Sequence, residues 1–266
     1  MQKIKQIWNR QFKSSKVPQI ALLFWLTKLV STGLGESVSD YSVRHLSNNL
    51  ILGSVLTLAW SSVFFFGFLY LTMRAHRYLA SPYWLTVALL AVFGTFISDA
   101  LRVGLGISLV FATAFWFVTL LISLVAMRLI TGSLSIHQIK TGKAEFLYWI
   151  AVGISFVMGT SLGDYLANAK SLGGLGLGTL SSGILLFIPF AVILIYRFFA
   201  HPKLDGMLEV SSFWIAYILT RPIGASFADY FGREFLGKGI GVLTMVFIWL
   251  ALFIPLFSLN VSSSKK

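Results

Sequence analysis

The chain has 266 residues, of which 57% are hydrophobic and 11% are charged, and its formal net charge is +12. Soluble domains carry roughly 25% charged residues, so this composition favours an integral membrane protein whose partner is the lipid bilayer. The basic residues are scattered between apolar runs rather than gathered into a patch, and we therefore expect no nucleic-acid partner. The absence of cysteine excludes disulfides, thiolate metal sites and thiol nucleophiles.

Residues 1–17 form a basic segment ahead of the first apolar run. Ile4, Trp8 and Phe12 recur every four residues among lysines and arginines, which predicts a short amphipathic helix on the cytoplasmic face of the membrane. A disordered basic tail is the alternative. We expect no cleavable signal, because the next apolar run contains Lys28 and lacks a small-residue cleavage site.

An internal repeat organises the rest of the chain in four copies. Each copy carries a tryptophan, a glycine ten residues later and an aspartate fifteen residues later, and successive tryptophans are 59, 65 and 65 residues apart. Four of the five aspartates obey this spacing, so coincidence is a poor explanation. The residues are Trp25, Trp84, Trp149 and Trp214, then Gly35, Gly94, Gly159 and Gly224, then Asp40, Asp99, Asp164 and Asp229.

Each repeat is long enough for two membrane-spanning helices. We predict helices over 18–41, 49–73, 82–101, 104–130, 145–167, 176–199, 211–232 and 239–259. The chain then divides into a basic segment (1–17), repeats over 18–79, 80–140, 141–205 and 206–260, and a polar tail (261–266). The predicted fold is an all-α integral membrane protein with eight transmembrane helices from four parallel two-helix repeats.

The distribution of lysine and arginine predicts the orientation. With eight spans, fourteen of the 21 basic residues share the side of both termini, five lie opposite, and Lys28 and Arg221 lie within helices. The positive-inside rule places both termini in the cytoplasm, and we expect a bacterial inner membrane. The repeats all enter in one direction, which predicts pseudo-symmetry about the membrane normal. The four tryptophans should lie at the inner interface, with the aspartates about 22 Å further along.

The pattern resembles a bacterial membrane-protein family of four tandem repeats of unknown function, each with two transmembrane segments and a characteristic tryptophan. The resemblance covers roughly residues 20–258 and implies a fold but no activity. Asp99-Ala100 departs from the pattern by lacking the tyrosine that follows the other repeat aspartates. The residues that carry it are Thr27-Lys28-Leu29, Gly35-Glu36-Ser37-Val38-Ser39-Asp40-Tyr41, Asp164-Tyr165 and Asp229-Tyr230.

The ionisable residues of the first helices fall on one face. Counted from the repeat tryptophan, Lys28 is at +3, Arg221 at +7, Glu36 at +11 and the aspartates at +15, which lie within an arc of about 120° on a helix. Ions facing lipid cost several kcal/mol, so this face should point into the bundle. Supporting polar residues on or beside it are Thr32, Ser39, Thr95, Ser98 and Thr160.

The glycines and aspartates have structural interpretations as well. The four repeat glycines should allow close approach of helices. Three aspartates precede an arginine by three or four residues, and an ion pair would then explain each of them. Asp164 has Asn168 at that position instead, which makes it the stronger candidate for binding. The three arginines are Arg44, Arg102 and Arg233.

The leading functional hypothesis is a transporter or exporter of a small, hard cation. Glu36 and the four repeat aspartates would bind a Mn²⁺-, Mg²⁺- or Ca²⁺-like ion or a proton, with Glu36 and Asp164 as the first candidates for metal ligands. Arg221 or Lys28 would compete for Glu36 as a gating charge pair when the site is empty, and a purely structural Glu36–Arg221 bridge is the alternative.

Two alternatives remain open. The first is an organic-solute or anion carrier that uses Lys28 or Arg221, with Trp25 and Trp149 as apolar walls. The second is a non-transporting scaffold or sensor. We expect no enzyme activity and no cofactor, and the sequence leaves open whether the chain forms a homo-oligomer.

Overall fold

The computed structural model describes residues 10–99, 102, 106–200 and 205–264. Within this part of the chain the long elements are all α-helices, and the one β-bridge joins Gln11 to Thr141. The eight long helices are α2 (Leu22–His45), α3 (Leu50–Arg74), α4 (Ala80–Asp99), α5 (Leu109–Thr131), α6 (Gly142–Ala167), α7 (Thr179–Ala200), α8 (Met207–Asp229) and α9 (Val242–Ser263). Short 3-10 turns cover Ile136–Gln138, Lys170–Leu172 and Phe235–Gly237, and a π-helical turn covers Tyr230–Glu234.

Each of the eight predicted spans corresponds to one of these helices. The helix ends differ from the predicted ones by a few residues; the largest difference is at the start of α5, predicted at 104 and observed at Leu109, and α2 continues past the predicted end at 41 to His45. The predicted spans 82–101 and 104–130 include residues 100, 101 and 103–105, which lie outside the described residues. Within the described part, α5 begins at Leu109 after a Ser108 N-cap whose hydroxyl accepts a hydrogen bond from Phe111 N.

Six of the helices are long and apolar enough to cross a membrane, namely α3, α4, α5, α6, α7 and α9. A multi-pass membrane protein is therefore indicated. The other two long helices, α2 and α8, carry Lys28, Glu36, Glu209 and Arg221. Their polar residues face neighbouring helices, since all four of these side chains are buried.

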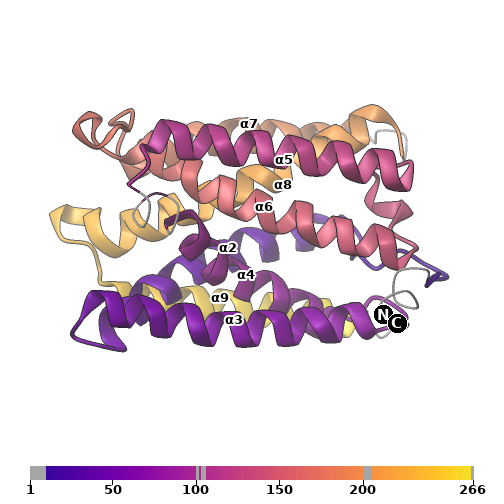
Figure 1. Ribbon diagram of the computed structural model, residues 1–266, viewed down its shortest axis with the longest axis horizontal. Coiled ribbons are helices and arrows are strands. Elements are labelled where there is room, and N and C mark those ends of the chain that lie inside the picture. Colours follow the sequence, from indigo (N-terminus) through magenta and orange to yellow (C-terminus); the bar gives the residue numbers. More distant parts are fainter. Residues whose placement is uncertain (1–9, 100–101, 103–105, 201–204, 265–266) are drawn as a thin grey trace.

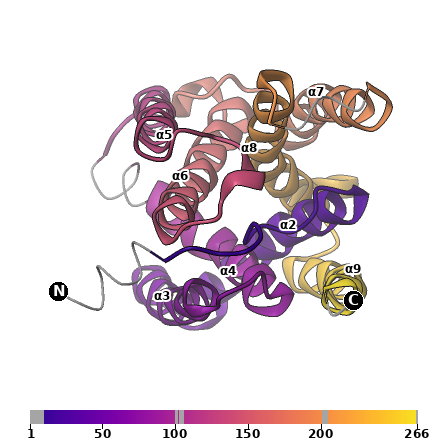
Figure 2. The same ribbon diagram turned by 90° about the vertical axis from the view of Figure 1, so that its right-hand side faces the viewer.

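The helices form an inner ring and an outer ring, which Figure 2 shows end-on. The inner ring consists of α2, α4, α6 and α8, each in contact with the next, and α8 returns to α2. The outer helices α3, α5 and α7 pack mainly on the first helix of the following repeat, and α9 packs on α2. Large apolar side chains such as Ile51, Phe111, Ile188 and Ile254 are exposed on the outer helices, as expected for a lipid-facing surface.

The repeat glycines set the spacing of the inner ring. A side chain at each glycine would meet the residue at +7 of the next repeat, and a Cβ at Gly159 would lie 2.7 Å from Cβ of Arg221. The same relation holds all the way round, so the four inner helices run in the same direction in matched register. The sequence predicted a packing role for these glycines, and the residues that lie against them form the pairs Gly35–Ala91, Gly94–Phe156, Gly159–Arg221 and Gly224–Thr32.

The sequence predicted the repeat tryptophans at the inner membrane interface, and the structure shows that they lie inside the bundle, enclosed by neighbouring helices. Their exposed fractions are 1%, 0%, 6% and 4% in chain order. Each tryptophan packs on the aromatic residue that precedes the tryptophan of the preceding repeat, with centroids 5.3–6.2 Å apart. The physical reason is that aromatic partners from neighbouring helices remove the indoles from both lipid and water.

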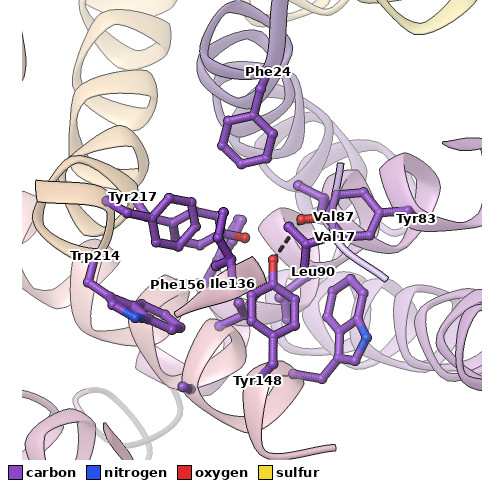
Figure 3. Packing of buried hydrophobic residues seen from close by; sticks show 14 of the residues in the cluster. Val17, Phe24, Tyr83, Val87, Leu90, Ile136, Tyr148, Phe156, Trp214 and Tyr217 are labelled. Carbon is purple, nitrogen blue, oxygen red and sulfur yellow. Dashed lines mark hydrogen bonds between the residues drawn. The ribbon is translucent and has the colours of Figure 1, made fainter. Parts of the chain in front are cut away.

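The four repeat tryptophans and the aromatic residues that precede them form a closed circle of eight side chains, which we call the aromatic ring. Within each repeat the two neighbouring aromatic side chains also touch, with centroids 5.0–5.5 Å apart. Figure 3 shows the hydroxyl groups of Tyr83 and Tyr148 of this set pointing toward each other, 2.6 Å apart. Its members, in spatial order, are Phe24, Trp25, Phe213, Trp214, Tyr148, Trp149, Tyr83 and Trp84.

Residues 10–20, which we call the strap, cross the end of the bundle next to the aromatic ring (Figure 2). Phe12 and Val17 are buried there, and Lys16 Nζ donates to Glu145 Oε2 at 2.5 Å and to Thr72 O at 2.8 Å. None of the strap residues is helical, so the amphipathic helix predicted for residues 1–17 does not extend to Phe12. Residues 1–9, with Ile4 and Trp8, lie outside the described residues.

Candidate functional site

The candidate site lies on the inner faces of the four first helices, in levels set by the repeat. The aromatic ring lies near the starts of α2, α4, α6 and α8. The two ends of the chain are marked at the right of Figure 1. Lys28 lies one turn beyond the ring, followed by Arg221, then Glu36, and finally the repeat aspartates. These levels follow directly from the +3, +7, +11 and +15 positions, because residues four apart on a helix share a face.

Arg221 and Glu36 form a buried ion pair between α8 and α2. Arg221 Nη2 donates to Glu36 Oε2 at 2.6 Å and to Thr95 Oγ1 of α4, also at 2.6 Å. The exposed fraction of the side chain is 1% for Arg221 and 10% for Glu36. The pairing expected from the sequence is therefore present, and three inner helices meet at it.

Three carboxylates converge beside this pair. One oxygen each from Glu36, Asp40 and Asp229 lies within 4.8 Å of the others. Asp40 follows Glu36 by one turn of α2, while Asp229 comes from the end of α8. Such an all-oxygen group suits a hard cation.

Arginine partners also reach the acidic side chains. Arg233 of the π-helical turn that follows α8 pairs with Asp40 of the neighbouring helix α2, and with Asp229 at 3.5 Å. The predicted local partner of Asp40 was Arg44, but its ion pair is with Arg233. Asp99 pairs with Arg102 at 3.8 Å, as the sequence suggested.

Asp164 was a candidate metal ligand in the sequence analysis. It is not part of the converging group formed by Glu36, Asp40 and Asp229. None of the ion pairs among the described residues includes Asp164. Asp164 is therefore an acid without an ion pair in this part of the chain, separate from the three converging carboxylates.

Lys28 is fully enclosed between the aromatic ring and the Arg221–Glu36 pair. Its exposed fraction is 1%, and Nζ lies 3.6 Å from the ring centroid of Phe156 and 4.2 Å from that of Tyr217. Both distances are those of cation–π contacts. Lys28 does not contact Glu36, which lies eight residues along α2, or about 12 Å.

The supporting polar residues mainly connect helices. Thr32 Oγ1 donates to Thr220 O of α8 at 3.0 Å, and Ser98 Oγ lies 2.8 Å from Ser161 Oγ of α6. Thr160 Oγ1 donates to Phe156 O of its own helix. Thr95 is thus the one of the five whose hydroxyl bonds directly to the ion pair.

A cavity of about 750 Å³ opens between α2, α3 and α4. Asp40, Asp99, Ser39 and Thr95 contribute to its inner wall, and apolar residues of α3 such as Leu50 line the other side. Two of the repeat aspartates therefore face a space large enough for a hydrated ion.

Sequence reasoning missed several of these features. An aromatic residue precedes every repeat tryptophan, a signal visible in the sequence that would have predicted the aromatic ring. The pairing of Arg233 with Asp40 joins residues 193 positions apart in different repeats, and no local spacing signals it. Glu145 and Glu209 were also missed, although both stand near the start of a first helix, where the helix dipole favours acids.

These observations define a multi-pass helical membrane protein built on a repeated two-helix unit, with an ionisable centre. The family model described as Repeat of Unknown Function (DUF347) matches the chain twice, over residues 147–202 and 212–266. The third and fourth repeats thus carry this family repeat, which confirms the resemblance to a tandem-repeat family of unknown function. None of the curated proteins and none of the solved structures compared matches the chain.

Proposed function

We propose that the protein transports a small, hard cation through the centre of the inner ring. The observation that carries the proposal is the convergence of Glu36, Asp40 and Asp229 within 4.8 Å, next to arginines that can release them. Carboxylate oxygens without cysteine ligands favour Mn²⁺, Mg²⁺ or Ca²⁺. Five acids on the inner faces exceed the four cations there, which are three paired arginines and Lys28, and this leaves one excess negative charge.

In the proposed mechanism the arginines hold the site when no cation is bound. A cation arriving from the acidic end displaces Arg221 from Glu36 and Arg233 from Asp40. The aromatic ring and the strap close the other end, so the ion cannot pass in this conformation. Release on the far side requires the inner helices to move apart at the aromatic ring, in an alternating-access cycle.

The same proposal includes the membrane arrangement. All eight long helices span the bilayer, four repeats surround a pseudo-fourfold axis along the membrane normal, and both termini face the cytoplasm of a bacterial inner membrane. The contacts that support it are the matched glycine pairs and the packing of α9 on α2. The alternative of Trp25 and Trp149 as walls of a solute site has less support, because both are enclosed in the aromatic ring.

Uptake of Mn²⁺ into proteoliposomes tests the proposal. Glu36→Gln keeps the shape and removes one ligand charge, so we expect Mn²⁺ uptake to fall to background while the protein still inserts. Glu234→Gln is the matched control, because Glu234 lies at the same end but binds Thr179 and is exposed. Equal uptake in wild type and Glu36→Gln, or no uptake of Mn²⁺, Mg²⁺ or Ca²⁺ by the wild type, would refute it.

A further inference from the structure

The level between the aromatic ring and Glu36 has an excess of positive charge. Lys28 and Arg221 are each 1% exposed, and Glu36 is the carboxylate bonded to Arg221. Only one of Arg221's terminal nitrogens, Nη2, is used in that pair. One buried cation is therefore left without a counter-charge, which is costly in a low-dielectric interior.

Three nitrogen donors at this level have no hydrogen-bond acceptor among the described residues. They are Lys28 Nζ and the Nε and Nη1 atoms of Arg221. The rings of Phe156 and Tyr217 face Lys28 Nζ and stabilise its charge. Ring faces, however, satisfy neither the hydrogen bonds of Arg221 nor the net charge.

The two side chains share one region of the bundle. Tyr217 and Arg221 are four residues apart on α8 and so lie on one face. Lys28 Nζ lies against the Tyr217 ring, which is one helical turn from Arg221 on α8. Phe156 of α6 forms the opposite wall.

We propose that Lys28 and Arg221 bind a small monovalent inorganic anion of the halide class inside the bundle. A water molecule would satisfy the donors but leave the excess charge. A neutral Lys28 would remove the charge but leave Arg221 Nε and Nη1 without acceptors. A small anion would accept the hydrogen bonds and also balance the charge. The aromatic walls and the close packing of α2 on α8 limit its size. This site goes beyond the proposed cation transport, since it takes the opposite charge at a different depth.

The test uses the full-length protein purified in detergent without divalent metal, so its result does not depend on cation transport. Chloride replaces gluconate at constant ionic strength and pH, and the melting temperature and binding of ³⁶Cl⁻ are measured. We expect a saturable rise in melting temperature with chloride or bromide, and about one ³⁶Cl⁻ bound per chain. Identical melting temperatures in chloride and gluconate, with no bound ³⁶Cl⁻, would overturn the proposal in favour of water or a neutral amine.

Variants assign the binding to Lys28. Lys28→Met should weaken ³⁶Cl⁻ binding on the order of tenfold or more, whereas Lys28→Arg should retain it. Lys238→Met is the control, because Lys238 is exposed in the loop before α9. If Lys28→Met does not fold, wild-type binding and its retention in Lys28→Arg still decide the matter. Undiminished binding in Lys28→Met would place the anion elsewhere and refute the assignment.

Discussion

At the scale of single residues, the repeat creates equivalent positions that hold different side chains in the four copies. Position +7 holds Thr32, Ala91, Phe156 and Arg221 in the four repeats, and each packs against a repeat glycine. A glycine is needed at +10 because the neighbouring helix lies too close for a side chain. Arg221 is the charged member of the four, and it pairs with Glu36 while its Cβ packs against Gly159.

Gly35→Ala tests this close approach. A methyl group at Gly35 would overlap Cβ of Ala91, so α2 and α4 must separate. We expect a loss of about 1–3 kcal/mol in the free energy of unfolding, measured by denaturant titration in mixed micelles. Gly153→Ala in α6 is the matched control, since no atom lies within 4 Å of the added methyl. It should stabilise the protein by about 0.8–1 kcal/mol, and a similar gain in Gly35→Ala would contradict the packing argument.

At the scale of elements, the strap connects parts of the chain that the repeats leave separate. Lys16 contacts Glu145 of α6 and the last turn of α3, so residues before the first repeat link the second helix of repeat 1 to repeat 3. Burial lowers the pKa of Lys16, and Glu145 offsets part of that shift. The pair therefore matters chiefly because each partner compensates the buried charge of the other.

A double-mutant cycle on Lys16 and Glu145 measures that compensation. Lys16→Met leaves Glu145 buried without its partner and should cost about 3–5 kcal/mol of unfolding free energy. The double variant Lys16→Met with Glu145→Met should recover most of this loss, because neither charge is then buried. Lys13→Met, at an exposed position in the strap, should have no effect. An additive loss in the double variant would mean that the two residues act independently.

The helices and their repeat were predictable because both depend on local pattern. Long apolar runs and the Trp–Gly–Asp spacing are read directly, and the glycine contacts followed from them. The strap was not predicted as an extended segment, since Phe12, Lys16 and Val17 show no strand-like alternation and become buried only when other helices cover them. The partner of Asp40 could not be predicted because it depends on the π-helical turn that follows α8. This turn holds Arg233, which pairs with Asp40 of the neighbouring helix α2.

At the scale of the whole molecule, the ends of the chain close the bundle. The outer helices α3, α5 and α7 each pack on the first helix of the next repeat, and the last helix, α9, packs on α2. Asn260 Nδ2 of α9 donates to Thr27 Oγ1 of α2 at 2.8 Å and completes this closure. Closure brings repeat 4 beside repeat 1, and without it Arg221 and Glu36 would not meet.

Single cysteines in this cysteine-free chain test the membrane arrangement, with a maleimide reagent that cannot cross the membrane. If α2 and α8 span the bilayer, Asn48→Cys and Lys238→Cys should be labelled from outside cells. Ser14→Cys and Met207→Cys should be labelled only in inverted vesicles, because Ser14 lies before α2 and Met207 is the first residue of α8. All four positions are exposed to solvent or lipid at the bundle ends. Labelling of Ser14 and Asn48 from the same side would mean that α2 does not cross. The acids of its inner face would then have access to only one aqueous compartment, which is incompatible with a transport path through the ring.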